Sequence, residues 1–222
     1  MMKRLLTIAV TALLATPFST QAEGTAIGGR ISTLGMGAEM TQELAPHLNA
    51  RVGVNGWSYD KSMGEGGIDY DARVDLFTGS ALLDWHFFEG SFRFTGGIML
   101  NANEFGLTGK PEAGTLWEVG TTSYDSELVG TLESTIDFND IAPYVGIGWG
   151  NPIGNKGVNI VFDVGVLYQG SPSATLKAVG TDATIVDALQ ADLAIERANL
   201  EDDLSDFNIW PVASIGLSYQ FQ

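Results

Sequence analysis

The sequence predicts an all-β fold, a transmembrane up-and-down antiparallel β-barrel of eight strands, and three observations support this prediction. Apolar and polar residues alternate with a period of two from about residue 26 onward, with Gly, Asn and Asp between the runs. The chain is rich in the residues of strands and turns, with 28 Gly, 11 Phe, 6 Tyr and 5 Trp. No stretch reaches the roughly eighteen consecutive apolar residues of a membrane-spanning helix.

The first element is an export signal over residues 1–22. Lys3 and Arg4 precede an apolar run over residues 5–15, and a small-x-small site ends at Ala22. This order is typical of a secretory signal peptide. We therefore expect cleavage near Ala22 and a mature domain over residues 23–222.

The expected strands follow in chain order. They lie near residues 25–33, 34–41, 51–55, 80–87, 92–103, 144–149, 160–169 and 214–221. The first is included because a single-chain bacterial barrel has an even number of strands, which leaves no open edge in lipid. In the last strand, Ile215, Leu217, Tyr219 and Phe221 share one face, as expected for a face that contacts lipid.

The connections between these strands divide into short and long ones. Short turns over 45–49, 89–90 and 151–157 are expected to face the periplasm, and long loops over 61–67, 110–128 and 170–206 to face outside. Aromatic residues near the strand ends predict two interfacial belts. The inner belt would hold Trp85, Phe87, Phe92, Trp149, Tyr219 and Phe221, and the outer belt Trp57, Tyr59, Tyr168, Phe207 and Trp210.

A soluble antiparallel barrel is the alternative fold, with apolar residues inside and polar residues outside. Asp84, Arg93 and Asp163 argue against it, because they lie in mid-strand on the face opposite large apolar residues.

Several stretches resemble the small outer-membrane barrels of the OmpA/OmpW type. These are the closing strand 215–221, the run Leu-Leu-Asp-Trp-His at 82–86 and the segment 142–150. In that family a terminal strand with a final aromatic residue is read by the barrel-assembly machinery, which points to Tyr219 and Phe221, although here Gln222 follows. The resemblance implies location in the bacterial outer membrane, in contact with lipid and lipopolysaccharide, and does not imply a single function.

The interior of an eight-stranded barrel is only wide enough for side chains. We expect a lumenal ion network in which three arginines balance three carboxylates, so that salt bridges plug the lumen. A narrow polar path for small solutes or protons is the alternative. The residues of this network are Arg30, Glu39, Arg51, Asp84, His86, Arg93 and Asp163.

The loop over 170–206 is expected to contain an acidic amphipathic helix near 182–204, capped by Thr181 or Asp182. Its acids are expected mainly to form a solvated face. The sharper hypothesis is a divalent-cation site bridging lipopolysaccharide phosphates, since oxygen-rich clusters suit Ca²⁺ or Mg²⁺. That site would use Glu201, Asp202, Asp203 and Asp206.

Composition and motifs exclude several classes of function. A net charge of −16 argues against nucleic-acid binding, and the lack of Cys removes thiolate chemistry. The sequence has no G-x-S-x-G, H-E-x-x-H or Walker motif, and no serine nucleophile is evident beside Asp84 and His86. We therefore expect a monomer without enzymatic activity or cofactor.

The leading functional hypothesis is an integral outer-membrane barrel with a structural or surface-interaction role. The alternative is a narrow channel or transporter for small molecules, as the OmpW resemblance suggests. A lipid-modifying barrel enzyme is the third reading, and it would need a His–Ser pair at the outer rim.

Overall fold

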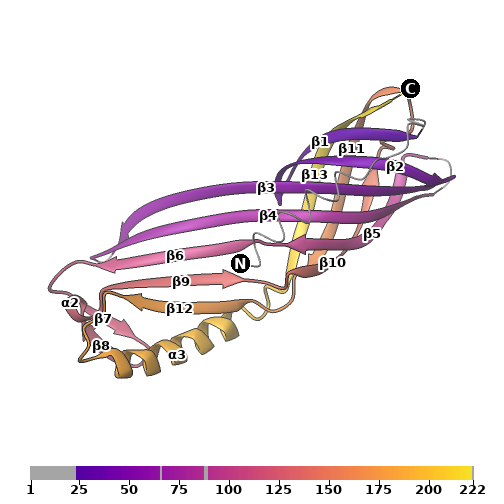
Figure 1. Ribbon diagram of the computed structural model, residues 1–222. Coiled ribbons are helices and arrows are strands. Elements are labelled where there is room, and N and C mark those ends of the chain that lie inside the picture. Colours follow the sequence, from indigo (N-terminus) through magenta and orange to yellow (C-terminus); the bar gives the residue numbers. More distant parts are fainter. Residues whose placement is uncertain (1–23, 66, 88–89, 222) are drawn as a thin grey trace.

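The structure is a computed structural model that describes residues 24–65, 67–87 and 90–221. Figure 1 shows a barrel at one end of the molecule and a long sheet that extends from it at the other. The expected signal segment lies outside the described residues and stays a prediction, as does the turn at Glu89.

Eight antiparallel strands form a closed ring. In spatial order they are β1 Thr25–Ser32, β2 Gly35–Ala45, β3 Leu48–Glu65, β4 Ile68–His86, β5 Phe92–Asn101, β10 Ile141–Trp149, β11 Gly157–Tyr168 and β13 Ile209–Gln220. The ring closes where β1 pairs with β13, with Ala26 opposite Gln220. The prediction of eight barrel strands is confirmed, including the first one.

A second sheet continues beyond the barrel, and we call it the distal sheet. Strands β3 and β4 are 18 and 19 residues long and extend past the ring as one hairpin. Outside β4 lie β6 Glu104–Pro111, β9 Thr131–Asp137 and β12 Ser173–Val179, in the order β12-β9-β6-β4-β3. The expectation of long loops was therefore wrong for residues 61–65, which belong to β3, and for residues 173–179, which form β12, while residues 116–119 and 122–125 form a separate hairpin and residues 186–203 a helix.

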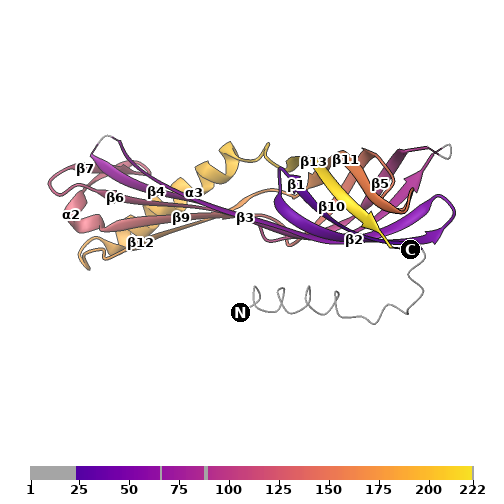
Figure 2. The ribbon, with the colours of Figure 1, turned by 90° about the horizontal axis from the view of Figure 1, so that it is seen from above.

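One face of the distal sheet carries the remaining elements. These are the hairpin β7 Leu116–Val119 and β8 Thr122–Asp125, the short helix α2 Ser126–Val129, and the long helix α3 Val186–Asp203. Leu189 and Leu193 of α3 are buried against Val119, Tyr124 and Val129, and Figure 2 shows α3 lying along one side of the sheet. No helix in the described ranges is long and apolar enough to cross a membrane.

The expected helix is confirmed, but its expected cap is wrong. Helix α3 begins at Val186 after Ile185, which makes no capping hydrogen bond with its side chain. The carboxylate of Asp182 instead accepts hydrogen bonds from the backbone nitrogen and the hydroxyl of Thr184. This local turn takes up the oxygen that would otherwise cap a helix.

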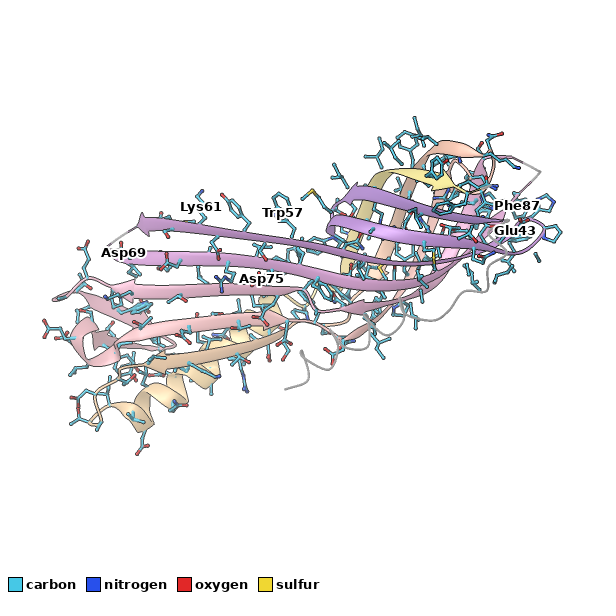
Figure 3. The ribbon with its side chains drawn as sticks, turned by 45° about the horizontal axis from the view of Figure 1, so that its top comes forward. Glu43, Trp57, Lys61, Asp69, Asp75 and Phe87 are labelled. Atoms are coloured by element: carbon cyan, nitrogen blue, oxygen red, sulfur yellow. The ribbon has the colours of Figure 1, made fainter. Side chains whose placement is uncertain are left out.

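The polarity of β3 and β4 inverts where they leave the ring. Within the ring, Asn49, Arg51 and Asn55 of β3 are buried in the lumen, whereas the outer wall exposes large apolar side chains. From residue 57 onward the lumen-side face carries Trp57 and Tyr59, and the other face carries polar residues such as Asp60 and Asp75. Figure 3 shows Trp57 and Lys61 on the same side of β3. The outer face is thus apolar along the ring and polar beyond it, the pattern expected where strands leave a membrane.

Candidate functional site

The strand alternation directs a set of charged side chains into the lumen. Six residues from six different strands are buried there, each exposing 8% or less of its surface. They are Arg30 of β1, Glu39 of β2, Arg51 of β3, Asp84 of β4, Arg93 of β5 and Asp163 of β11. The structure therefore brings together six of the seven residues of the expected network.

Arg51 lies at the centre of this network. Its Nη1 lies 3.1 Å from Oδ2 of Asp163 and 3.4 Å from Oε2 of Glu39. Its Nη2 donates to Oδ1 of Asp84 at 3.1 Å and to Oδ1 of Asp163 at 3.1 Å. One guanidinium thus joins carboxylates from three strands, a use suited to its planar fork of donors.

Arg93 forms a second centre next to Arg51. Its Nη2 donates to Oδ1 of Asp163 at 2.7 Å, its Nε lies 3.6 Å from Oδ1 of Asp84, and its Nη1 donates to the carbonyl of Gly150. Gly148 makes room for it, because a Cβ there would lie 2.7 Å from Cζ of Arg93. Glycine on the neighbouring strand is therefore part of the site, since any side chain would collide with the guanidinium.

Neutral side chains complete the network. Arg30 donates to Glu39 at 3.0 Å and to Asn55 at 2.9 Å. The hydroxyl of Thr95 donates to Asp84 at 2.7 Å. Three arginines and three carboxylates are thus held by contacts that cross the lumen, so the buried charges balance, as burial requires.

His86 lies at the edge of this site without joining it. The residue is 4% exposed, and neither ring nitrogen has a hydrogen-bond partner in the described part of the chain. Asp84 is engaged by the two arginines and Thr95 instead. Both histidines, His47 and His86, line a polar cavity of about 280 Å³ at the short-turn end of the barrel.

An apolar layer fills the lumen on the side of the distal sheet. Leu82, Met99 and Leu167 are buried there in one cluster with Leu34, Ala142, Tyr144 and Val212, and Trp210 packs against it. Trp210 was expected in the outer aromatic belt, and this placement was wrong, as it was for Trp57 and Tyr59, which lie on the lumen-side face of β3. Leu82 could have been identified, because it shares its parity with Ser80 and Asp84 on the lumenal side of β4.

The four acids of the expected cation site do not converge. No group of three or more acidic or histidine residues in the described part of the chain is arranged to hold a metal ion. Glu201 instead accepts a hydrogen bond from the backbone nitrogen of Ala174 at 3.0 Å, which fixes the end of α3 to β12. Asp202, Asp203 and Asp206 are exposed.

Aromatic side chains gather on the outer wall at the short-turn end. Ring centroids lie 5.6 Å apart for Tyr219 and Phe221, and 5.3 Å apart for Phe92 and Trp149. In Figure 3, Glu43 and Phe87 mark this end, far from Asp69 at the tip of the distal sheet. Tyr219 and Phe221 thus lie where an interfacial belt is expected.

Comparison with solved structures identifies the fold. The chain is similar to CarO of Acinetobacter baumannii, with 20% identity, a TM-score of 0.55, and coverage of 88% of this chain and 97% of that one. It is similar to CarO2 of the same organism, with 18% identity, a TM-score of 0.56, and coverage of 89% and 98%. No protein-family model and no curated protein matches the sequence. The fold is therefore that of a small outer-membrane β-barrel.

Proposed function

We propose that this chain is an integral outer-membrane protein with a lumen closed to solutes, and that its distal sheet performs its role at the cell surface. The observation that carries the proposal is the ion network across the lumen, in which Arg51 and Arg93 bind Asp84 and Asp163. The apolar cluster around Leu82 and Met99 covers this network on the side of the distal sheet. The ion network and the apolar cluster would thus close the path through the lumen at two successive levels.

The outer wall supports the location in a membrane. Large apolar side chains on six ring strands are between 45% and 60% exposed, which is costly in water and favourable in lipid. Examples are Ile27, Leu83, Phe94, Val145, Ile160 and Leu217. The polarity inversion at Trp57 supports the same location, with the distal sheet outside the hydrocarbon.

A surface role follows from where the remaining polar and acidic residues lie. Helix α3 carries six acids and one base, Arg197, and it lies on the distal sheet. Outer-membrane lipid and lipopolysaccharide would surround the ring, and β13 with Tyr219 and Phe221 would meet the barrel-assembly machinery. A monomer without enzymatic activity fits this role, since the ring closes on itself and Asp84 does not orient His86.

Single-channel recording in a planar bilayer tests the closed lumen. We expect no conductance from the refolded mature chain, because both layers would have to move to admit an ion. Folding of the protein before reconstitution is checked by its gel shift on heating, and an open porin reconstituted in the same way serves as the positive control. Reproducible conductance steps would overturn the closed lumen and favour a narrow channel, with Arg51, Asp84 and Arg93 as its selectivity residues.

A further inference from the structure

A cavity of about 240 Å³ lies between the distal sheet and α3. Tyr70, Leu107 and Ser134 form part of its floor on β4, β6 and β9. Trp117 of β7 and Glu196 and Leu200 of α3 form part of its roof. Its volume lies below the roughly 300–1,000 Å³ of pockets for drug-sized ligands, so an occupant would be small.

Two aromatic rings meet at one corner of this cavity. At Gly109 a Cβ would lie 3.1 Å from the indole of Trp117 and 3.4 Å from the ring of Tyr70. Glycine therefore lets the indole approach the sheet beside the phenol ring. The two rings together offer an apolar surface on which the apolar body of a small ligand can pack.

The charges around the cavity have one sign. The charged residues among the described lining are Glu118, Glu133 and Glu196. Glu133 lies opposite Lys177 on the outer face of the sheet, away from the cavity. Glu118 lies between Trp117 and Val119 in β7, so its side chain is on the opposite face of that strand. Glu196 lies three residues after Leu193 and four before Leu200, so it lines the cavity at the solvent-exposed edge of the packing face of α3 and supplies the carboxylate.

The bases of the distal sheet lie mostly on its other face. Lys110 pairs in register with Asp69, and Arg73 contacts Asp60 with Nε 2.7 Å from Oδ1. Lys177 shares that face with Glu133. Lys61 is on the same face as the cavity, but on β3 and outside the lining. The carboxylate of Glu196 is therefore not neutralised by a base of the described lining, and the site is complementary to a cation.

We propose that this cavity binds a small organic amine with an apolar body. The ammonium group lies beside the carboxylate of Glu196, and the apolar body packs on Leu107, Leu200 and the aromatic corner. This inference rests on the proposed surface role, and it names the class of ligand that the distal sheet would take.

Three probes of matched shape test the charge requirement. Binding of 2-phenylethylamine, 2-phenylethanol and 3-phenylpropanoate to the folded protein in lipid nanodiscs is measured by titration of protein NMR signals at pH 7. We expect the amine to bind at least threefold more tightly than the alcohol, and the carboxylate most weakly. Equal or tighter binding of 3-phenylpropanoate, or no saturable binding of the amine, would overturn the proposal.

The substitution Glu196→Gln tests the carboxylate without changing its shape. We expect it to remove the preference for the amine over the alcohol while leaving alcohol binding unchanged. Asp202→Asn is the matched control, since it removes one charge from the same helix outside the cavity, and it should preserve the preference. A preference that survives Glu196→Gln would refute the assigned role of this residue.

Filling the cavity provides a second, independent test. Ser134 lies between Leu107 and Leu176 in register, on the cavity side of β9. Ser134→Leu should abolish binding of all three probes, whereas Thr135→Leu adds a similar side chain on the opposite face and should leave binding intact. Unchanged binding to folded Ser134→Leu would contradict the assigned location.

The outcomes of this test and of the bilayer recording are separate. A silent barrel that does not bind the amine would refute the ligand class alone. A conducting barrel that binds the amine would refute the closed lumen alone.

Discussion

At the scale of single residues, Arg51 and Arg93 are the two centres of the lumenal ion network. Each is almost fully buried, and each contacts Asp84 and Asp163. Removing one partner of such a buried group leaves the opposite charge uncompensated, which costs far more than the pair contributes as a whole.

Arg93→Ala should therefore destabilise the barrel by about 3–5 kcal/mol. The measurement is the urea unfolding midpoint in detergent micelles, with Arg73→Ala as control, because Arg73 is exposed and forms its ion pairs in solvent. The double substitution Arg93→Ala with Asp163→Asn restores charge balance and should lose less than the two single changes added together. An unchanged midpoint for Arg93→Ala would disprove the claim that Arg93 stabilises the barrel by compensating buried carboxylates.

A second residue pair fastens the β7–β8 hairpin to α3. The hydroxyl of Tyr124 donates to Oδ2 of Asp192 at 2.5 Å. This hydrogen bond lowers the pKa of Asp192 below its ordinary value of 3.8 and raises the pKa of Tyr124 above 10. Stability from Asp192 is present above pH 3.8 and lost as pH falls through its lowered pKa; stability from Tyr124 is present below pH 10 and lost as pH rises through its raised pKa.

Hydrogen exchange of residues 116–125 should therefore be slowest between about pH 4 and pH 10, after correction for the intrinsic rate. Tyr124→Phe should speed exchange inside this window and leave little further change at its edges. Tyr59→Phe, at an exposed position of β3 in the distal sheet, should have no effect on this segment. A flat, wild-type level of protection in Tyr124→Phe would rule out this coupling.

At the scale of elements, α3 is held by a narrow set of contacts. Leu189 and Leu193 are buried, whereas Ile195 of the same helix is 44% exposed. Because the cavity lies next to Leu193, shortening this side chain would enlarge the cavity and remove packing between α3 and the β7–β8 hairpin.

Leu193→Ala should weaken docking of α3 by about 2–4 kcal/mol. The measurement is limited proteolysis of the folded protein, in which cleavage between residues 180 and 208 should become faster. Ile195→Ala is the matched control and should be cleaved at the wild-type rate. Equal cleavage of both variants would mean that α3 is not held through Leu193.

At the scale of the whole molecule, the strand register predicts that the barrel can fold without the distal sheet. Leu100 pairs with Ile141, Tyr168 with Ile209, and Trp57 with Leu76. Each of these pairs brings together two ends that a tight turn could join, so the ring does not need the segments between them.

Replacing 102–140, 170–208 and 58–75 by short turns should leave a barrel that folds. The check is an electrophoresis gel with and without heating, on which both the full chain and the shortened chain should change mobility. A full chain that never shifts would argue against a barrel. A shift confined to the full chain would mean that the distal sheet is needed to close the ring.

The ring could be predicted from the sequence, because each barrel strand must place apolar side chains toward lipid and polar or small side chains toward the lumen. Arg51, Arg93 and Asp163 were assigned to the lumen only because they alternate with apolar residues along their strands. The distal strands were not predicted, because Asp60, Arg73 and Asp75 reverse the polarity that marks a barrel strand, and pairing of β6, β9 and β12 depends on neighbours distant in sequence. Trp210 shares its parity with Val212 and Ser218 on the lumenal side of β13, so strict alternation would have placed it correctly, and its closeness to a strand end led to the wrong assignment.

The inversion at residue 57 also fixes how high the protein stands. If the barrel sank by a few residues, each about 3.3 Å along a strand, Asp60 and Asp75 would enter hydrocarbon. If it rose, the apolar wall would be lifted into water. In the proposed orientation, the inversion therefore sets the depth of the barrel in the membrane and keeps the cavity under α3 above the lipid, where molecules arriving from outside would reach it.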